Sequence, residues 1–138
     1  MFSIGSIFIP VTNLESSTEW FERNLDLKKI SDWEDGAGFC LPSGSAQLSL
    51  VKVASAQATE FEIIRNNRNS YYNFFVNDIE AAHDKLISNG VKTSEIQDYD
   101  DMKFFDFFDL DNNPFSVVYE DINSPFHPDN IRKMQEKR

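Results

Sequence analysis

Val11-Thr12-Asn13-Leu14-Glu15-Ser16-Ser17 is matched later in the chain by a segment of the same character, Val76-Asn77-Asp78-Ile79-Glu80-Ala81-Ala82. An alternating apolar run precedes each segment, and an amphipathic stretch follows it. Alternation predicts a strand with one buried face, and the amphipathic stretch predicts a helix. The chain therefore repeats one strand–turn–helix unit. Any binding site is expected where the two copies meet.

The chain has 138 residues, which is long enough for one compact domain with a real core. We expect a single domain over residues 1–138. Its predicted parts are a first module at about 3–52, a linker at 53–70, a second module at about 71–120 and a tail at 121–138. Phenylalanine is unusually common, at 13 residues, so the core or a pocket should be rich in aromatic rings.

The formal net charge of −10 argues against two classes of partner. Phosphate backbones and anionic lipid are repelled by such a surface, so neither nucleic acid nor a membrane is expected. Pro10 interrupts the first apolar residues, no basic residue precedes them, and no apolar run approaches a bilayer span of about 20 residues. The single Cys40 allows no internal disulfide, and its apolar neighbours favour a small buried hydrophobe over a nucleophile. These features favour the reducing cytoplasm.

In the first module, residues 3–12 read as a strand and Asn13 as the N-cap of a helix. The apolar face of this helix is expected to hold Leu14, Ser17, Phe21 and Leu25. Three further strands are predicted at about 27–33, 37–41 and 46–52, with turns at Asp35-Gly36 and Pro42-Ser43-Gly44. The linker 53–70 is polar, and a short helical piece is expected around 58–65.

In the second module, Asn77 or Asp78 caps a helix that ends at Asn89-Gly90. Its apolar stripe is predicted to be Ile79, Ala82, Leu86 and Ile87. A short strand near 91–94 and an acidic loop at 98–101 follow. The last two strands are predicted at about 102–108 and 114–120, and residues 121–138 form a tail or a short terminal helix.

Each module thus reads β-α-β-β-β, and the fold class is α+β, with the helices outside two curled mixed sheets. One face of each sheet packs on its helix. The opposite faces are too polar for a core layer and too aromatic for open surface. Two such faces would curl into a cup-shaped cavity suited to a ligand. They carry Ser6, Phe8, Gln47, Ser49, Tyr71, Asn73, Phe75, Ser116 and Val118.

Over residues 3–120 the chain resembles the vicinal oxygen chelate superfamily, which includes glyoxalase I, extradiol dioxygenases, and bleomycin- and fosfomycin-resistance proteins. The two repeated segments carry the resemblance. The turn at 107–115, Phe-Phe-Asp-Leu-Asp-Asn-Asn-Pro-Phe, is similar to the Asp-Pro-Asp-Gly-Asn turn of that family. The resemblance implies the fold, but one scaffold hosts many activities.

Catalytic members of this family hold a divalent metal with His and Glu residues on four strands. The resemblance places these positions at Ser6, Tyr71, Ser116 and Ser49, or Gln47 if the register slips by two. Neutral hydroxyls and a phenol are poor ligands for a catalytic transition metal, so neither a metal nor another cofactor is expected. His83, on the second helix, and His127, in the tail, read as surface or boundary residues.

Several other side chains could have either a functional or a purely structural role. Asp106, among four phenylalanines, could act as a base or be an ordinary outward residue, and the second is favoured. Asp98, Asp100 and Asp101 could bind a hard cation, but they lack the Gly and Glu of a calcium loop, so a solvated loop is favoured. Three rings could stack on a planar ligand or simply pack: Phe8, Trp33 and Phe39.

The leading functional prediction is a metal-free protein that binds or sequesters a small molecule in the cup. The resemblance to the bleomycin-resistance branch also implies a homodimer. A negative protein favours a cationic or neutral ligand. The predicted ligand-binding residues are Ser6, Phe8, Ser49, Tyr71, Asn73, Phe75 and Ser116.

Two other functions compete with this prediction. One is a metal-free or atypical glyoxalase-like lyase, isomerase or dioxygenase-family enzyme, with Tyr71 or Asp106 as acid or base. The other is a non-catalytic interaction module. A packed cup would favour the interaction module, and an open apolar cavity would favour small-molecule binding.

Overall fold

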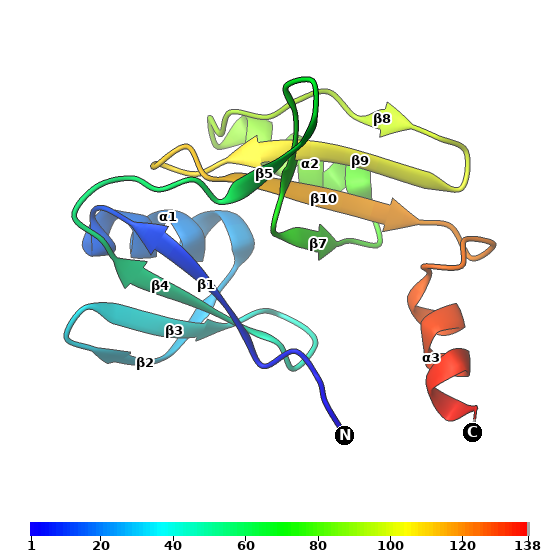
Figure 1. Ribbon diagram of the computed structural model, residues 1–138, viewed down its shortest axis with the longest axis horizontal. Helices are drawn as coiled ribbons and strands as arrows, with labels where there is room; N and C mark the ends of the chain where they lie inside the picture. The colour runs from blue at the N-terminus through cyan, green and yellow to red at the C-terminus, as the bar shows by residue number, and fades with distance from the viewer. Residues whose placement is uncertain (138) are drawn as a thin grey trace. The chain divides into compact units, whose positions relative to one another are not determined.

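The computed structural model describes residues 1–137 and divides into two compact units (Figure 1). The first unit comprises Met1–Tyr71 and Phe108–Asn113. The second comprises Tyr72–Phe107 and the chain from Pro114 onward. The prediction of one domain over residues 1–138 stays a prediction, and each unit is described by itself.

The first unit contains a four-stranded mixed sheet with one helix against it. Its strands are in the order β1-β4-β3-β2, where β1 and β4 are parallel and the other pairs antiparallel. The predicted strands and helix are therefore confirmed, with ends that differ by a few residues. The elements are β1 (Ser6–Val11), α1 (Leu14–Leu25), β2 (Lys28–Trp33), β3 (Gly36–Cys40) and β4 (Gln47–Lys52).

Helix α1 begins where the sequence predicts, because the Asn13 side chain accepts a hydrogen bond from the Ser16 N–H at 3.0 Å. It ends at Asp26 in the left-handed conformation. Ser17 and Phe21 are buried as predicted, and Asn24 is buried with them. The sheet residues that form this core are Ile9, Val11, Ala37, Phe39, Leu48 and Leu50.

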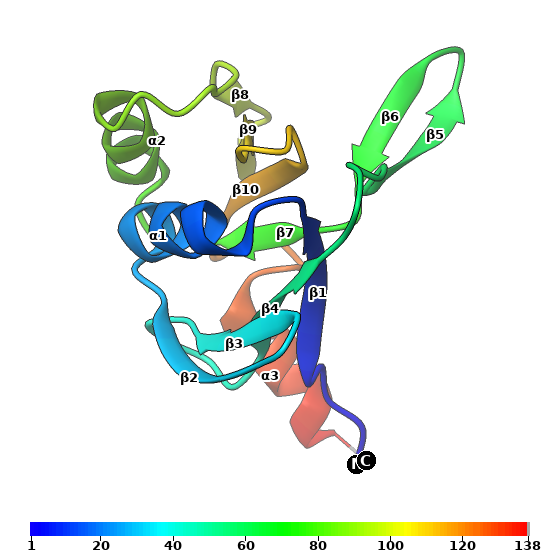
Figure 2. The ribbon, with the colours of Figure 1, turned by 90° about the vertical axis from the view of Figure 1, so that its left-hand side faces the viewer.

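A β-hairpin occupies most of the segment predicted as a linker. Strands β5 (Glu60–Ile64) and β6 (Asn67–Ser70) pair as a separate two-stranded sheet, visible in Figure 2, so the helical piece expected around 58–65 is wrong. Arg65 and Asn66 form the turn with φ of 50° and 70°. Two consecutive positive φ values give the type I′ twist that matches paired strands, which explains the hairpin.

The second unit repeats the architecture of the first. Its sheet has the order β7-β10-β9-β8, with β7 and β10 parallel, which is the β1-β4-β3-β2 pattern of the first unit. Figure 1 shows α2 against this sheet and α3 beyond the end of β10. The elements are β7 (Asn73–Phe75), α2 (Ile79–Ser88), β8 (Gln97–Asp98), β9 (Met102–Phe108), β10 (Pro114–Glu120) and α3 (Pro128–Glu136).

Helix α2 decides between the two predicted N-caps and corrects one residue of the predicted apolar stripe. Asp78 rather than Asn77 is its N-cap and accepts from the Ala81 N–H at 3.0 Å. Ile87 is 52% exposed, so it does not belong to the buried stripe. His83 is half-buried instead, with its ring edge-on to Phe105. The histidine therefore reads as a packed boundary residue.

The chain between α2 and β9 is less regular than predicted. Gly90 takes the left-handed conformation, with φ of 78°, and ends α2 as expected. The strand expected near 91–94 is wrong, because only an isolated bridge from Thr93 to Phe107 forms there. Strands β9 and β10 have the bounds that the sequence predicts.

Stacked rings fill the core of the second unit. Phe107 and Phe115 stack at 5.1 Å between ring centroids, and both are fully buried. Phe74 of β7 and Tyr72, the residue before β7, both pack on Phe115, with 5.8 Å between the ring centroids of each pair. Tyr72 and Phe74 lie on one face, and Asn73 and Phe75 lie on the other, as the alternation predicts.

The turn between β9 and β10 belongs to the first unit and is tied to it by hydrogen bonds. Asn113 donates from its side chain to the Pro10 carbonyl at 3.0 Å and accepts from the Thr59 hydroxyl at 3.0 Å. Asp109 accepts from both the backbone and the side chain of Asn113. Burial raises the pKa of the Asp109 carboxyl above its ordinary value, although these hydrogen bonds lower it.

The tail contains a helix, the second of the two forms predicted for residues 121–138, and its last residue lies outside the described residues. His127 is the N-cap of α3, and Pro128 occupies its first position. No helix found in residues 1–137 combines the length and the apolar character that crossing a membrane requires.

Candidate functional site

The first candidate surface is the face of the first unit's sheet that points away from α1. Phe8, Gly38 and Ser49 lie side by side on β1, β3 and β4. The Ser49 hydroxyl lies 3.3 Å from the Ser6 hydroxyl, and Ser49 is only 5% exposed. Phe8 is 58% exposed beside them. Two polar hydroxyls and an exposed ring therefore share this face.

Trp33 completes this face because two glycines leave room for its indole. A Cβ atom on Gly36 would overlap the indole ring, and one on Gly38 would lie 3.8 Å from it and 3.5 Å from the Ser49 Oγ. Gly36 thus begins β3 beneath Trp33 rather than forming the turn that the sequence predicts. Phe39 points to the opposite side and is fully buried, so it is a core residue and does not stack on a ligand.

Tyr71 contacts the β5–β6 hairpin and the residue before it. Its ring packs on Phe61 of the hairpin at 5.6 Å, and its N–H donates to the Thr59 carbonyl at 3.2 Å. More than half of its surface is exposed. A groove of about 430 Å³ in this unit involves none of the predicted ligand-binding residues. It is lined by Leu14, Glu15, Thr18, Glu19, Lys29, Asp32, Trp33 and Ala37.

The second candidate surface, within the second unit, is the corresponding face of that unit's sheet. Asn73 pairs with Ser116, and Phe75 with Val118, across β7 and β10. The Ser116 hydroxyl donates to the Asp106 carboxylate at 2.7 Å. The Asp106 backbone N–H donates to the Ser94 hydroxyl oxygen at 2.8 Å. Asp106 is therefore half-buried and held between two serines.

A groove of about 420 Å³ opens on this face, between the sheet and α3. Two of its lining residues, Asn73 and Phe75, were predicted from the sequence as ligand-binding residues. The sequence also placed Val118 on this face, but it did not indicate Glu120 or the lining residues from the tail. The spacing of Ile131 and Gln135, four residues apart after Pro128, could have indicated one face of a helix. The full lining is Asn73, Phe75, Val118, Glu120, Phe126, Pro128, Ile131, Arg132 and Gln135.

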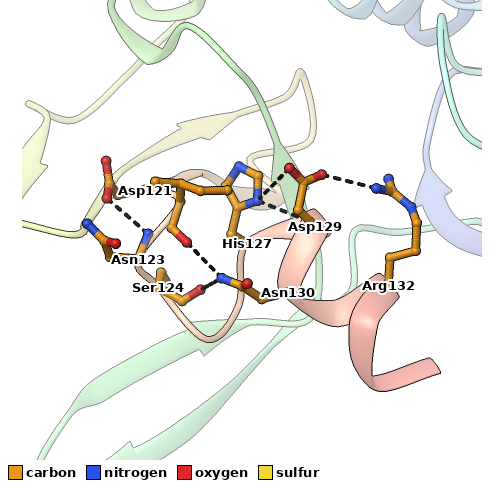
Figure 3. Close-up of polar contacts among 8 residues, drawn as sticks. Asp121, Asn123, Ser124, His127, Asp129, Asn130 and Arg132 are labelled. Atoms are coloured by element: carbon orange, nitrogen blue, oxygen red, sulfur yellow. Dashed lines mark hydrogen bonds and ion pairs between the residues drawn. The ribbon is translucent and has the colours of Figure 1, made fainter. Parts of the chain in front are cut away.

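A network of polar contacts fixes the wall formed by the tail (Figure 3). His127 Nδ1 accepts from the Asp129 N–H at 3.0 Å, which caps α3. Asn130 donates to the carbonyls of Ile122 and Ser124, at 2.7 and 2.8 Å. The His127 ring meets Phe75 edge-on at 6.3 Å. The histidine thus joins the helix start to the floor of the groove.

At the four positions where the resemblance placed the metal ligands, the side chains are neutral hydroxyls and a phenol, which are poor ligands for a transition metal. Ser6 and Ser49 contact each other, Ser116 contacts Asp106, and Tyr71 packs on Phe61. Within residues 1–137 no three His, Cys, Asp or Glu side chains form a group that could hold a metal ion. We therefore derive no step through a metal.

Two candidates remain, the Asp98 carboxylate and the Cys40 thiol. Asp98 lies in β8, accepts from the Asp100 N–H and is within 4.0 Å of the Lys103 ammonium. Cys40 is a free, half-buried thiol at the end of β3. Asp98 is exposed as expected but lies in a strand rather than in a loop, and Cys40 is half-buried rather than buried.

The fold and this site define a class of protein: an α+β scaffold of two βαβββ units with a ligand-sized groove. The family model for the Glyoxalase/Bleomycin resistance protein/Dioxygenase superfamily matches residues 3–117, and the chain belongs to this superfamily. A comparison with curated proteins finds no significant match.

Solved structures of this superfamily share the fold. The fosfomycin resistance protein FosX from Listeria monocytogenes has a TM-score of 0.70 at 13% identity, covering 88% of this chain and 96% of that one. TnmS3, an antibiotic binding protein from Streptomyces sp. CB03234, has a TM-score of 0.68 at 12% identity, covering 87% and 97%. A glyoxylase/bleomycin resistance protein/dioxygenase domain from Frankia sp. EAN1pec has a TM-score of 0.67 at 17% identity, covering 87% and 98%.

Proposed function

We propose that this protein binds and sequesters a small organic molecule without a metal and without changing a covalent bond. The observation that carries the proposal is the groove of about 420 Å³ on the open face of the second sheet, which Asn73 and Phe75 line. Its volume lies within the range of about 300–1,000 Å³ that is typical of ligand pockets. The structural neighbour TnmS3 is itself an antibiotic binding protein.

The proposed roles follow from the side chains. Each unit offers exposed rings that can stack on flat parts of a ligand, Phe8 and Tyr71 in the first unit and Phe75 in the second. Asn73 donates and accepts hydrogen bonds, and so can the hydroxyls of Ser6, Ser49 and Ser116. These seven residues are the ligand-binding residues that we propose, each within its own unit, and of them Asn73 and Phe75 line the groove of the second unit. No group among them needs to transfer a proton.

A thermal-shift screen of small organic molecules tests the proposal, followed by calorimetric titration of the hits. A ligand that binds only the folded protein raises its melting temperature with concentration. We expect Phe75→Ala to weaken binding of such a ligand about tenfold, because the ring's contact is lost. Tyr99→Ala is the matched control, since Tyr99 is an exposed aromatic residue of the same unit outside the groove.

Two outcomes would contradict the proposal. The first is a screen in which no molecule shifts the melting temperature. The second is a hit whose affinity responds equally to both substitutions. Elemental analysis of protein purified without chelator belongs to the same test, because one stoichiometric transition metal per chain would contradict a metal-free function.

We further propose that the protein acts as a homodimer in the cytoplasm. The support for the dimer is the resemblance to the bleomycin-resistance branch, and the support for the compartment is the single free thiol of Cys40. Sedimentation at several concentrations tests the dimer, and a mass of one chain throughout would overturn it.

One observation favours a second function, a metal-free enzyme. Asp106 accepts the Ser116 hydroxyl at 2.7 Å on the same face of the sheet as Asn73. A carboxylate in this place can accept a proton from a bound substrate. Mass spectrometry of the bound ligand after incubation separates the two functions. Conversion that Asp106→Asn abolishes would establish the enzyme, and an unchanged ligand supports sequestration.

A further inference from the structure

We propose that the groove between the second sheet and α3 selects a small aromatic cation, and that the Glu120 carboxylate recognises its charge. This inference rests on the proposed function and narrows its ligand class. It depends on three observations: the position of Glu120, the exposed apolar walls around it, and the pairing of the one arginine that also lines the groove.

The Glu120 carboxylate is held in place without a cationic partner. Its Oε1 accepts from the Ser124 hydroxyl at 2.7 Å, and the Ser124 Oγ in turn accepts from the Phe126 N–H at 3.1 Å. Ser124 is 2% exposed, so this support is fixed inside the unit. Within residues 1–137 no ion pair to Glu120 is formed. A half-buried carboxylate with one neutral donor favours a cation that approaches through the groove.

The walls around Glu120 suit a flat ring. Phe75 is 39% exposed and Phe126 71% exposed, and Val118, Pro128 and Ile131 complete an apolar lining. Burying such rings against a planar ligand is favourable, and a cation over an aromatic face gains further attraction. The volume of about 420 Å³ has room for a molecule of two or three rings.

Arg132 does not reverse this preference. Its guanidinium donates to the Asp129 carboxylate at 3.1 Å, so its charge is already paired, and its side chain is 61% exposed. The other polar lining groups, Asn73 and Gln135, are neutral amides that accept or donate hydrogen bonds without preferring a charge. The chain's net charge of −10 acts in the same direction as Glu120.

Calorimetric titration with two matched probes tests the inference. N-methylquinolinium is a flat, permanent cation, and quinoline is its neutral counterpart at pH of about 7.5. We expect the cation to bind at least about tenfold tighter, which corresponds to about 1.4 kcal/mol. Glu120→Gln should abolish this preference and leave quinoline binding unchanged. Glu136→Gln is the matched control, because it removes the same charge from an exposed position of α3 outside the groove.

Circular dichroism of Glu120→Gln verifies that the variant is folded. Arg132→Gln is a second variant with an independent expectation: the affinity for N-methylquinolinium stays equal or rises. A fall in that affinity would count against the charge assignment. The two variants together therefore keep the inference testable if one of them does not fold.

Three results would overturn the inference: equal affinities for the two probes, a cation affinity that Glu120→Gln leaves unchanged, or no cation binding at about 1 mM, the weak end of ligand affinities. Each differs from failure of the proposed function. A neutral ligand whose binding Phe75→Ala weakens would preserve sequestration while removing the cation preference. A screen without any hit would remove sequestration itself.

Discussion

The two units have the same strand order but different open faces. In the first unit, the lack of side chains at Gly36 and Gly38 leaves space on the sheet for the Trp33 indole. The paired hydroxyls of Ser6 and Ser49 lie on the same face. In the second, β7 and β10, the counterparts of β1 and β4, carry Asn73, Phe75 and Val118, and α3 adds a wall. The repeat thus preserves the apolar character of the side chains that pack on the helices, while the opposite faces differ.

This difference shows which residues the fold requires and which it leaves open to function. A core position tolerates few side chains because interiors are close-packed. Residues on the open face contact few core atoms, so they can vary without loss of the sheet. The cores themselves also differ: Ile9, Leu48 and Leu50 dominate the first, whereas Phe107 and Phe115 stack in the second.

The largest expected effect comes from removing a ring of the second core. Phe115→Ala should lower the free energy of unfolding by about 4 kcal/mol, because a fully buried ring leaves a cavity. Trp20 and Trp33, the chain's two tryptophans, both lie in the first unit, so their fluorescence reports on that unit alone. We expect fluorescence and circular dichroism to shift to lower urea together, because β9 continues into the turn at 108–113.

The control for Phe115→Ala is Phe2→Ala, which removes a ring that is almost fully exposed and should change little. If circular dichroism detects an early transition that fluorescence does not, the two units unfold independently. That result would contradict the expected coupling and sharpen the comparison between the units.

A smaller loss is expected from the turn that carries Asn113. Asn113→Ala removes its side-chain bonds to Asp109, Pro10 and Thr59 and leaves buried groups without partners. Because each unsatisfied buried group costs about 1–3 kcal/mol, we expect a loss of about 3 kcal/mol in the free energy of unfolding. Urea denaturation measures it, with the exposed Asn77→Ala as control. Equal stability of the two variants would show that the network contributes nothing.

The sequence predicted helices and strands well where local chemistry decides the structure. Asn13 caps α1, and β9 and β10 have the predicted bounds, because alternation and turn residues act over short distances. The hairpin of β5 and β6 was missed, since its turn is Arg65-Asn66 rather than a typical pair with glycine. The groove wall was missed because it depends on where the tail folds back, which periodicity does not encode.

The candidate site was predictable only in part for the same reason. Alternation placed Ser6 and Ser49 on one face, and their hydroxyls are in contact. It also placed Asn73 and Phe75 on one face, and both line the groove. It did not indicate Glu120, because a carboxylate at the end of a strand looks like any solvated charge until Ser124 and α3 surround it.

A moderate effect is expected from filling the space that Gly36 leaves in the first unit. Gly36→Ala places a Cβ atom where the Trp33 indole lies, so the ring must move. Such overpacking costs about 1–3 kcal/mol, and we expect about 2 kcal/mol with a changed tryptophan emission maximum. Gly5→Ala is the control, since its Cβ would meet nothing within 4 Å. An unchanged emission spectrum in Gly36→Ala would show that the glycine does not position the indole.

The smallest expected effect is the pH dependence that Asp109 adds to the first unit. Burial raises the pKa of this carboxyl above 3.8, so between that value and the raised pKa the folded chain binds more protons than the unfolded chain. The contribution of Asp109 to stability is therefore greatest at low pH and falls as the pH rises through this range. We expect wild type to lose stability relative to Asp109→Asn as the pH rises from below 3.8. Urea denaturation at a series of pH values measures this difference, and a shift in favour of wild type would mean that the hydrogen bonds from Asn113 outweigh burial.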